Sequence, residues 1–582
     1  MENENITLQI KFKQAVTKYG KSAALHMDQY TLTYEELDYC SDVICNMLRE
    51  ILKDQKEATI AILVSNSFMK FIYMLGVLKA GYTYAPLDYK SAFERNLKIL
   101  AVANADALLT EERFTDEAEE VIKRGLLIKN EVLIENVSEL LKKERREFYS
   151  ESTQERIAYV IFTSGSSGIP KGVEVQDKAI LNFCSSVIHR IGISEKDKTI
   201  ALSNFGFDAS VFDMYPFLLS GAEIYLIKEE DRKDIISLNQ YMIKSCITIQ
   251  CMTTALYHLF LNVENPVLEK LCVIGEKMLF YRKKNYRIFN MYGPTEATVL
   301  VTLTEIRQSS SDIPVGYPID NTDIYIVDKE GNKKSLREKG EICIEGICLA
   351  KGYRNNQEEN DKHFHEDLIT GKRRYYTGDI GMMEEDGNLH CYGRIDSQIK
   401  YRGYRIELDE IRKNILQYES IEDAVVLFLE EEVGNFIVTA YCQKQPVDIK
   451  QLKIFLEKQL PEYMIPQKWF LMDQFPLNEN KKINTQEIRK KFYEKYNMDS
   501  LGKSEDKDIE ERLKSIWSEV LALEKGKDFR ADEEFTVLGG DSLQSLTMLL
   551  RVNKEFNTQV LFEEFIENPT IERLVEIVKR RK

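Results

Sequence analysis

The sequence lacks any apolar stretch that approaches the roughly 20 residues needed to cross a lipid bilayer. It also lacks the basic and apolar start of a secretory signal, because its first residues, M-E-N-E-N, are acidic and polar. The ten cysteines form no C-x-x-C pair and stand mostly among apolar residues, as Cys343 does. We therefore expect reduced core cysteines in a cytoplasmic protein without a membrane partner.

An excess of positive charge is missing as well. The formal net charge is −16, and the basic residues are scattered apart from short clusters at 142–146 and 579–582. This balance does not suit the phosphate backbone of a nucleic acid, so we expect no nucleic-acid partner. With 582 residues, 43% of them hydrophobic and 30% charged, the chain predicts a globular protein of several domains.

The most informative segment that is present is 163–172, which reads T-S-G-S-S-G-I-P-K-G. Its glycines allow backbone N–H groups to approach phosphate oxygens, its hydroxyls add donors, and Lys171 adds a positive charge. The apolar run 157–162 predicts a buried strand that leads into this loop. Because Pro170 and Gly172 flank the lysine, the segment is not a Walker A loop. We interpret it as a loop that wraps a polyphosphate; a flexible Ser/Gly linker is the alternative.

Further motifs follow in a fixed order along the chain. They are L-T-Y-E-E-L at 32–37, L-K-A-G-Y-T-Y-A-P-L-D at 78–88, Y-G-P-T-E at 292–296, G-E-I-C-I-E-G at 340–346, Y-Y-T-G-D at 375–379, G-R-I-D-S-Q-I-K-Y-R-G-Y-R-I-E-L at 393–408 and L-P-E-Y-M-I-P at 460–466. With segment 163–172, this series resembles the adenylate-forming superfamily, in particular the adenylation domains of nonribosomal peptide synthetases. The resemblance implies an α/β fold with a large N-terminal subdomain of β-sheets and helices, 1–395, and a small α+β C-terminal subdomain, 396–490.

The C-terminal part of the chain has a different pattern. Residues 491–508 are polar and charged and predict a linker. Apolar residues at helical spacing in 511–521 predict an amphipathic helix, and F-T-V-L-G-G-D-S-L follows. This part, 509–582, resembles a peptidyl carrier protein, an all-α four-helix domain. The resemblance implies that Ser542 starts the second helix and carries 4′-phosphopantetheine, whereas the purely structural alternative is a helix N-cap at Asp541 or Ser542.

The resemblance further implies that ATP activates a carboxylate, a reaction in which cations and oriented amides offset the repulsion between two anions. It assigns catalysis to Thr163, Lys171, Glu296 and Lys482. Glu296 is also the expected ligand of Mg²⁺. The expected nucleotide-binding residues are Ser164, Gly165, Ser166, Ser167, Gly168, Tyr292, Thr295, Asp379 and Arg394.

The resemblance assigns roles to three residues of the C-terminal motifs, Asp396, Gly403 and Lys482. Asp396 resembles the hinge between the two subdomains, and Gly403 resembles the thiolation loop, where its backbone approaches an incoming thiol arm. Around Lys482 the sequence reads P-L-N-E-N-K-K-I-N, in which Lys481 and Asn484 replace the glycine and aspartate of the family pattern. Lys481 is therefore the competing lysine, and a surface loop with two solvated lysines is the plain alternative.

The substrate class depends on the segment S-N-F-G-F-D-A-S-V-F-D at 203–213. Members that activate amino acids carry an aspartate at the place of Asp208, which pairs with the substrate ammonium; a simple helix N-cap is the alternative. The other pocket positions that the resemblance implies are Ala209, Phe212, Gln250, Cys272, Ile274, Met291, Val299 and Leu300. None is charged and two are bulky, so we expect a small or medium aliphatic amino acid, with Gln250 available to a polar substituent.

Neither H-H-x-x-x-D-G nor G-x-S-x-G occurs, so we expect no condensation or thioesterase domain. The resemblance thus implies a monomeric loading or initiating module that makes aminoacyl-AMP from ATP and transfers the acyl group to its own carrier. Its expected partners are a phosphopantetheinyl transferase and a downstream condensation domain or other acceptor enzyme. The alternatives are an acyl- or aryl-acid ligase fused to a carrier, and a catalytically silent scaffold that presents the carrier.

Overall fold

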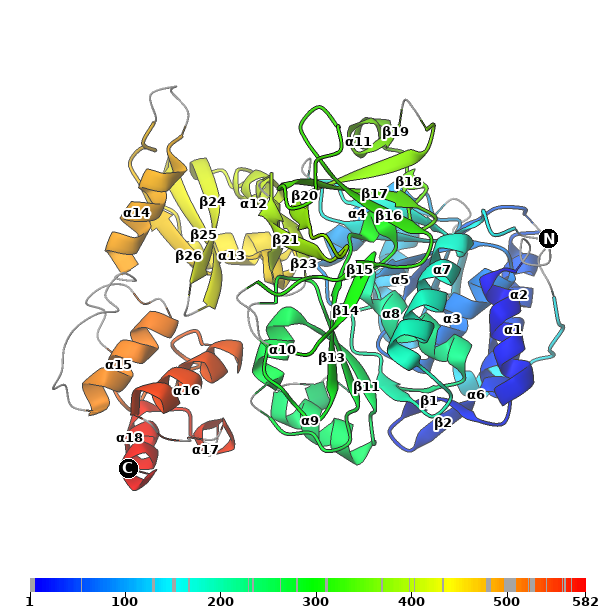
Figure 1. Ribbon diagram of the computed structural model, residues 1–582, viewed down its shortest axis with the longest axis horizontal. Helices are drawn as coiled ribbons and strands as arrows, with labels where there is room; N and C mark the ends of the chain where they lie inside the picture. The colour runs from blue at the N-terminus through cyan, green and yellow to red at the C-terminus, as the bar shows by residue number, and fades with distance from the viewer. Residues whose placement is uncertain are drawn as a thin grey trace. The chain divides into compact units, whose positions relative to one another are not determined.

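The computed structural model describes residues 6–581 with gaps at 54, 128–130, 149–152, 166–167, 229, 233–234, 262, 279–280, 309–311, 368–369, 397, 402–403, 432–433, 478–482, 497–508, 522, 524–528, 541, 557, 559, 561 and 567. Figure 1 labels its helices and strands. The chain divides into two compact units: unit 1 is Met1–Glu410 with Glu457–Tyr463, and unit 2 is Ile411–Leu456 with Met464–Lys582. The domain boundaries expected near 395, 490 and 508 stay predictions.

The largest sheet of unit 1 has seven strands in the order β18-β8-β7-β4-β3-β5-β6. They are β3 (Thr59–Leu63), β4 (Thr83–Leu87), β5 (Ala107–Thr110), β6 (Glu131–Ile134), β7 (Ile157–Thr163), β8 (Lys171–Gln176) and β18 (Gly352–Tyr353). The strands from β7 to β6 run parallel, and β8 is antiparallel to β7 and to β18. β7 is buried after its first residue, which confirms the strand predicted at 157–162.

Three more sheets and a hairpin supply the other strands described in unit 1. The sheet β2-β1-β10-β9 contains β1 (Ala23–Met27), β2 (Tyr30–Thr33), β9 (Lys198–Ile200) and β10 (Glu223–Tyr225). The sheet β11-β12-β13-β14-β15 contains β11 (Ile249–Thr253), β12 (Lys270–Ile274), β13 (Arg287–Tyr292), β14 (Thr302–Ile306) and β15 (Tyr317–Pro318). The sheet β16-β17-β20-β19, with β21 beside β20, contains β16 (Thr322–Val327), β17 (Gly340–Gly346), β19 (Phe364–Glu366), β20 (Arg373–Met383) and β21 (Leu389–Arg394). The hairpin pairs β22 (Gln398–Tyr401) with β23 (Tyr404–Glu407).

The helices of unit 1 begin and end at recognisable signals. The capping box of α2 joins the Thr33 side chain to the Glu36 N–H and the Glu36 side chain to the Thr33 N–H, and α8 ends at Gly221, which has φ +83°. The helices are α1 (Leu8–Tyr19), α2 (Tyr34–Ile51), α3 (Phe68–Lys79), α4 (Phe93–Ala103), α5 (Thr115–Lys123), α6 (Val137–Leu140), α7 (Asp177–Val187), α8 (Ala209–Ser220), α9 (Ile235–Lys244), α10 (Thr254–Phe260) and α11 (Gln357–His363). Short helical turns lie at η1 (Glu112–Phe114), η2 (Ile188–Gly192), η3 (Glu230–Arg232), η4 (Thr295–Ala297) and η5 (Glu462–Met464).

Unit 2 combines a small sheet with helices. Its strands are β24 (Ile421–Glu431), β25 (Gly434–Gln443) and β26 (Lys468–Leu471), and its helices are α13 (Ile449–Glu457), α14 (Thr485–Tyr496), α15 (Ile509–Val520), α16 (Ser542–Phe556), α17 (Phe562–Ile566) and α18 (Ile571–Arg581). Helix α12 (Leu408–Ile415) crosses from unit 1 into unit 2. Figure 1 shows α15 to α18 together, coloured orange to red. Trp517 is fully buried among them, where its ring stacks on Phe529 and meets Phe535 and Phe565 edge to face.

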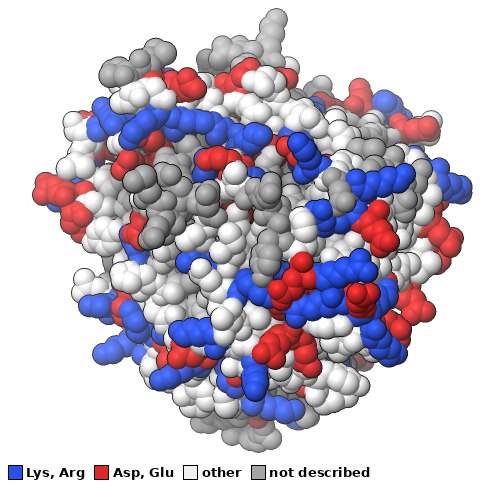
Figure 2. Space-filling view, turned by 90° about the vertical axis from the view of Figure 1, so that its right-hand side faces the viewer, with Lys and Arg blue, Asp and Glu red and all other residues white. Residues whose placement is uncertain are grey.

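The cysteines, the length of the apolar helices and the distribution of charge on the surface each bear on the expectations from the sequence. All ten cysteines are free, and most of them are buried. None of the helices in the described residues is long and apolar enough to span a bilayer. Figure 2 shows one face of the molecule, on which positive and negative side chains are intermingled.

Candidate active site

The glycine-rich segment forms the turn between β7 and β8, whose register pairs Thr163 with Lys171. Two of its glycines are required there. A Cβ on Gly165 would lie 2.1 Å from the carbonyl oxygen of Ile169, and Gly168 has φ +82°. The hydroxyl oxygen of Thr163 is buried and has no hydrogen-bond partner among the described residues. An unsatisfied buried hydroxyl is costly, so this one points to a ligand such as a phosphate. Ser166 and Ser167 lie outside the described residues.

Lys171 begins β8 and is almost fully buried. Its ammonium lies 3.1 Å from a carboxylate oxygen of Glu359 on α11 and 3.9 Å from one of Glu407 on β23. The ring of Tyr353 faces the same ammonium, with its centroid 5.4 Å away. The predicted phosphate-binding lysine is therefore held between two carboxylates.

Glu296 lies in η4, directly after the Y-G-P-T turn, and its side chain is fully buried. The hydroxyl of Tyr353 donates to one carboxylate oxygen over 2.7 Å, and the guanidinium of Arg405 donates to the other over 2.6 Å. Burial is the largest influence on the pKa of Glu296 and raises it. Arg405, Tyr353 and Lys171 outweigh that effect and lower the pKa to about 2. Glu296 is consequently an anion, as a Mg²⁺ ligand must be.

Asp379 and Arg394 come together because β20 and β21 pair them directly. The Arg394 guanidinium donates to one Asp379 oxygen over 2.7 Å, and the Tyr292 hydroxyl donates to the other over 2.6 Å. Arg394 also contacts both oxygens of Asp396, the predicted hinge residue, at 2.7 Å. Lys400 of β22 lies over the Tyr292 ring, 4.9 Å from its centroid. The structure thus groups three of the predicted nucleotide-binding residues.

Asp208 precedes α8 and lies partly buried. It occupies the N-cap position, yet its side chain makes no capping hydrogen bond. Instead it accepts a hydrogen bond from the Thr295 hydroxyl over 2.6 Å. Burial raises the pKa of Asp208 above its ordinary value of 3.8; the Thr295 hydrogen bond opposes this rise, and the nearby charge of Glu296 adds to it. A cationic partner would stabilise the ionised form of such a carboxylate.

Most of the residues predicted to line the substrate side-chain pocket are buried. Phe212, Cys272, Met291, Val299 and Leu300 are buried in one hydrophobic cluster, against which Ile274 packs. The positive φ angle of Val299, +72°, is unusual for a β-branched residue and marks local strain. Ala209 is the first residue of α8.

Gln250 differs from the other pocket positions because its side-chain amide is hydrogen-bonded to backbone groups. The Ile200 N–H donates to its oxygen over 3.2 Å, and its nitrogen donates to the carbonyl oxygens of Ile200 and Cys251 over 3.3 and 3.0 Å. The side chain is fully buried. These bonds tie β11 to the end of β9.

Sequence reasoning missed several residues that contact the predicted site, among them Tyr353, Glu359, Arg405 and Glu407. Arg405 stands in the quoted motif 393–408, where its charge two residues after Gly403 is the signal that was available. Tyr353 and Glu359 belong to no quoted motif. Lys482 and Gly403 lie outside the described residues. Ser542 is the first residue of α16, and the prediction placed it at the start of a helix.

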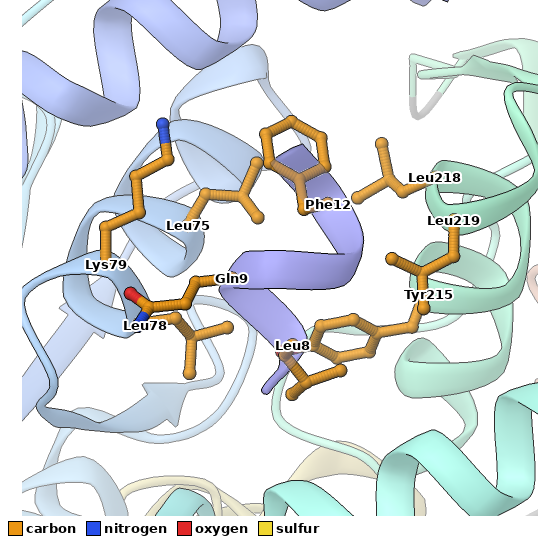
Figure 3. Close-up of a pocket in the computed structure, with 9 residues that line it drawn as sticks. All are labelled: Leu8, Gln9, Phe12, Leu75, Leu78, Lys79, Tyr215, Leu218 and Leu219. Carbon is orange, nitrogen blue, oxygen red and sulfur yellow. The ribbon is translucent and has the colours of Figure 1, made fainter. Parts of the chain in front are cut away.

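A small pocket lies apart from the predicted site residues, between α1, α3 and α8 (Figure 3). It is mostly apolar, and its lining includes none of the residues assigned above to catalysis or binding. Figure 3 shows Phe12 between the leucines of α3 and those of α8.

The family model described as "AMP-binding enzyme" matches residues 12–354. The chain belongs to this family. A second model, "phosphopantetheine attachment site", matches 511–578. These matches confirm the resemblance to an adenylation domain fused to a carrier protein, and they confirm the adenylate-forming class of enzyme. They also confirm the predicted cofactors, which are ATP, Mg²⁺ and covalent 4′-phosphopantetheine. The anionic Glu296, the cationic Lys171 and the unsatisfied Thr163 hydroxyl fit a metal-bound triphosphate.

The chain is similar to peptide synthases. It is 33% identical to bacitracin synthase 1 of Bacillus licheniformis over 100% of this chain and 11% of that protein. It is also 33% identical to surfactin synthase subunit 2 of Bacillus subtilis, over 98% of this chain and 16% of that protein. The chain therefore spans a small part of these relatives.

A solved structure confirms the fold class. It is holo-PA1221, described as an NRPS protein that contains adenylation and PCP domains, with a TM-score of 0.76 and 20% identity over 99% of this chain and 97% of that one. The mixed α/β unit 1, the small sheet of unit 2 and the helices α15 to α18 agree with the predicted fold class.

Proposed function

We propose that this chain activates an amino acid with ATP and transfers it as a thioester to the 4′-phosphopantetheine on its own Ser542. The observation that carries the amino-acid part is Asp208, a partly buried carboxylate with a raised pKa, which borders an uncharged cluster. A substrate ammonium supplies the charge that this environment lacks. The cluster then receives an apolar substrate side chain.

The first step needs the substrate carboxylate to approach the α-phosphate of ATP, with departure of pyrophosphate. Lys171, the backbone of the glycine-rich turn and the Thr163 hydroxyl hold the outer phosphates and draw off their negative charge. Asp379 holds the ribose hydroxyls, Arg394 contacts the nucleotide, and Tyr292 offers an aromatic face to the adenine. Mg²⁺, held by Glu296, screens the charge of the phosphates when it is bound. In this proposal Lys482 neutralises the negative charge that develops at the α-phosphate.

In the second step the pantetheine thiol attacks the acyl carbon of the aminoacyl-AMP, so that the thioester bond forms and AMP departs. Asp396 serves as the hinge for the change between the two steps, and Gly403 leaves room for the pantetheine arm. The domains proposed for these steps are 1–395, 396–490 and 509–582, with 491–508 as the linker. We include in the proposal a monomeric loading or initiating role in the cytoplasm, a phosphopantetheinyl transferase as partner, and a downstream condensation domain or other acceptor.

For the substrate we propose a small or medium aliphatic amino acid. Ile274, Met291 and Val299 are bulky and pack in or against one hydrophobic cluster, which supports this choice. The amide of Gln250 is engaged by Ile200 and Cys251, so the proposal gives it no role toward a polar substituent.

Pyrophosphate exchange with panels of amino, fatty and aryl acids, followed by intact-protein mass spectrometry of the holo-chain, tests the proposal. We expect exchange with one or a few aliphatic amino acids and a matching mass increase that S542A abolishes. Exchange with fatty or aryl acids alone would establish an acyl- or aryl-acid ligase. A folded chain without exchange on any panel would be a scaffold.

A further inference from the structure

The hairpin β22–β23 brings one cation and one anion to the two charged groups of the predicted nucleotide site. Arg405 reaches the metal ligand Glu296, and Glu407 reaches the phosphate lysine Lys171. We propose that these two hairpin residues stand in for metal-bound ATP, Arg405 for the metal and Glu407 for a phosphate. Docking of the hairpin and binding of Mg²⁺ with ATP then exclude each other. This inference deepens the proposed function and rests on it.

The cation side of this exchange is a buried ion pair. The guanidinium of Arg405 is 2.6 Å from Glu296, and the two side chains are 15% and 0% exposed. The other oxygen of Glu296 accepts from Tyr353. Both oxygens are therefore engaged by donors, and a metal ion gains the carboxylate only when Arg405 leaves. Because neither charge is well solvated, each needs a counter-ion. This is either its present partner or another group with the same sign of charge as that partner.

The anion side involves the phosphate loop. Glu407 lies 3.9 Å from the Lys171 ammonium, and the Ser164 hydroxyl donates to the carbonyl oxygen of Arg405 over 2.8 Å. Two groups predicted to bind phosphate oxygens thus contact oxygens of the hairpin instead. Glu359 also contacts Lys171, at 3.1 Å, from outside the hairpin, so it keeps the lysine placed when Glu407 withdraws.

The hairpin holds its two charges in a fixed relation. Gln398 accepts from the guanidinium of Arg405 and donates to the carboxylate of Glu407, both over 2.6 Å. Tyr404, which directly precedes Arg405, stacks on Tyr463 with ring centroids 3.8 Å apart and meets Phe207 edge to face at 4.8 Å. Phe207 directly precedes Asp208, so the docked hairpin also adjoins the proposed ammonium site.

In the proposed reaction this exchange orders the two steps. For adenylate formation Arg405 would leave Glu296 and Glu407 would leave Lys171, so that Glu296 could hold the metal and Lys171 the phosphates. Once pyrophosphate and the metal have left, Arg405 and Glu407 neutralise Glu296 and Lys171, and the site stays charge-balanced while the thiol arrives. Rebinding of ATP is blocked during that interval.

Binding of Mn²⁺ to the full-length chain, followed by electron paramagnetic resonance, tests the inference without any turnover. We expect R405Q to bind Mn²⁺ about tenfold more tightly than the unchanged chain, because the competing cation is gone. R405K keeps a cation and restores weaker binding. K329Q, which removes a charge from an exposed turn residue, serves as the matched control and leaves the affinity unchanged.

A second variant keeps the inference testable if R405Q does not fold. Q398A releases Arg405 and Glu407 from their shared contact, and we expect it to tighten Mn²⁺ binding in the same direction. Mn²⁺ affinity that is unchanged or weaker in whichever of these variants folds would overturn the inference. Because the readout is metal binding, failure to activate any amino acid would contradict the proposed function and leave this measurement interpretable.

Discussion

At the scale of single residues, Glu296 shows how a buried carboxylate stays charged. Its burial opposes ionisation, while Arg405, Tyr353 and Lys171 favour it, and the pKa falls to about 2 from an ordinary 4.5. Because the folded-state pKa is the lower one, ionisation of Glu296 stabilises the fold above about pH 4.5. That contribution is lost as the pH falls toward 2.

Replacement of Glu296 tests this balance. E296Q leaves the guanidinium of Arg405 buried without an anion, and we expect a loss of about 3 kcal/mol in the free energy of unfolding at neutral pH. The variant also loses part of the acid dependence described above. Thermal unfolding of the full chain at several pH values measures both effects, with E330Q at an exposed turn as the control. A variant as stable as the unchanged chain contradicts the ion-pair account.

At the scale of the elements, Gln250 connects strands of two sheets. Its amide makes hydrogen bonds with Ile200 at the end of β9 and with Cys251 on its own strand. The family resemblance assigned this position to the substrate pocket, but the resemblance carries no information about strand contacts across 50 residues. The structure gives the amide a supporting role instead.

The variant Q250L separates the two roles of this position. Removal of the amide leaves the N–H and carbonyl of Ile200 unpaired in a buried place, so we expect a loss of about 2 to 3 kcal/mol in stability. Denaturant unfolding of the full chain measures it, and T17A on the exposed surface of α1 is the control. A change in amino-acid preference without a loss of stability would favour the pocket role.

The elements also show what the sequence could and could not predict. The strand at 157–163, the turn after it and the helix that begins at Ser542 follow from local signals, namely an apolar run, glycines and the D-S-L motif. The fold class came from the order of the motifs rather than from periodicity. The contacts of Glu296 with Tyr353 and Arg405 span 57 and 109 residues, so no local pattern contains them.

At the scale of the whole molecule, the predicted phosphate loop and the carrier helices lie in different compact units. Trp517 packs among the carrier helices, against Phe529, Phe535 and Phe565, and belongs to unit 2. The predicted phosphate loop and Glu296 belong to unit 1. The two half-reactions of the proposed function should therefore respond differently to damage in one core.

The variant W517A tests this independence. Loss of a fully buried tryptophan costs about 3 to 5 kcal/mol and is expected to unfold the carrier helices. We expect pyrophosphate exchange to persist while attachment of phosphopantetheine and of the amino acid is lost. Exchange and mass spectrometry on the same preparation measure the two outcomes. Loss of exchange in proportion to loading would show that the two regions share one cooperative fold.

The most direct test of the account concerns Asp208 and the substrate ammonium. The measurement is kcat/KM for pyrophosphate exchange with the preferred amino acid, compared between the unchanged chain, D208N and the control D328N, whose side chain lies in the turn after β16. We predict that D208N lowers kcat/KM about a hundredfold or more, because a partly buried ammonium loses its anion, while D328N has no effect. Equal kcat/KM values for D208N and the unchanged chain would contradict the proposed recognition of an amino acid.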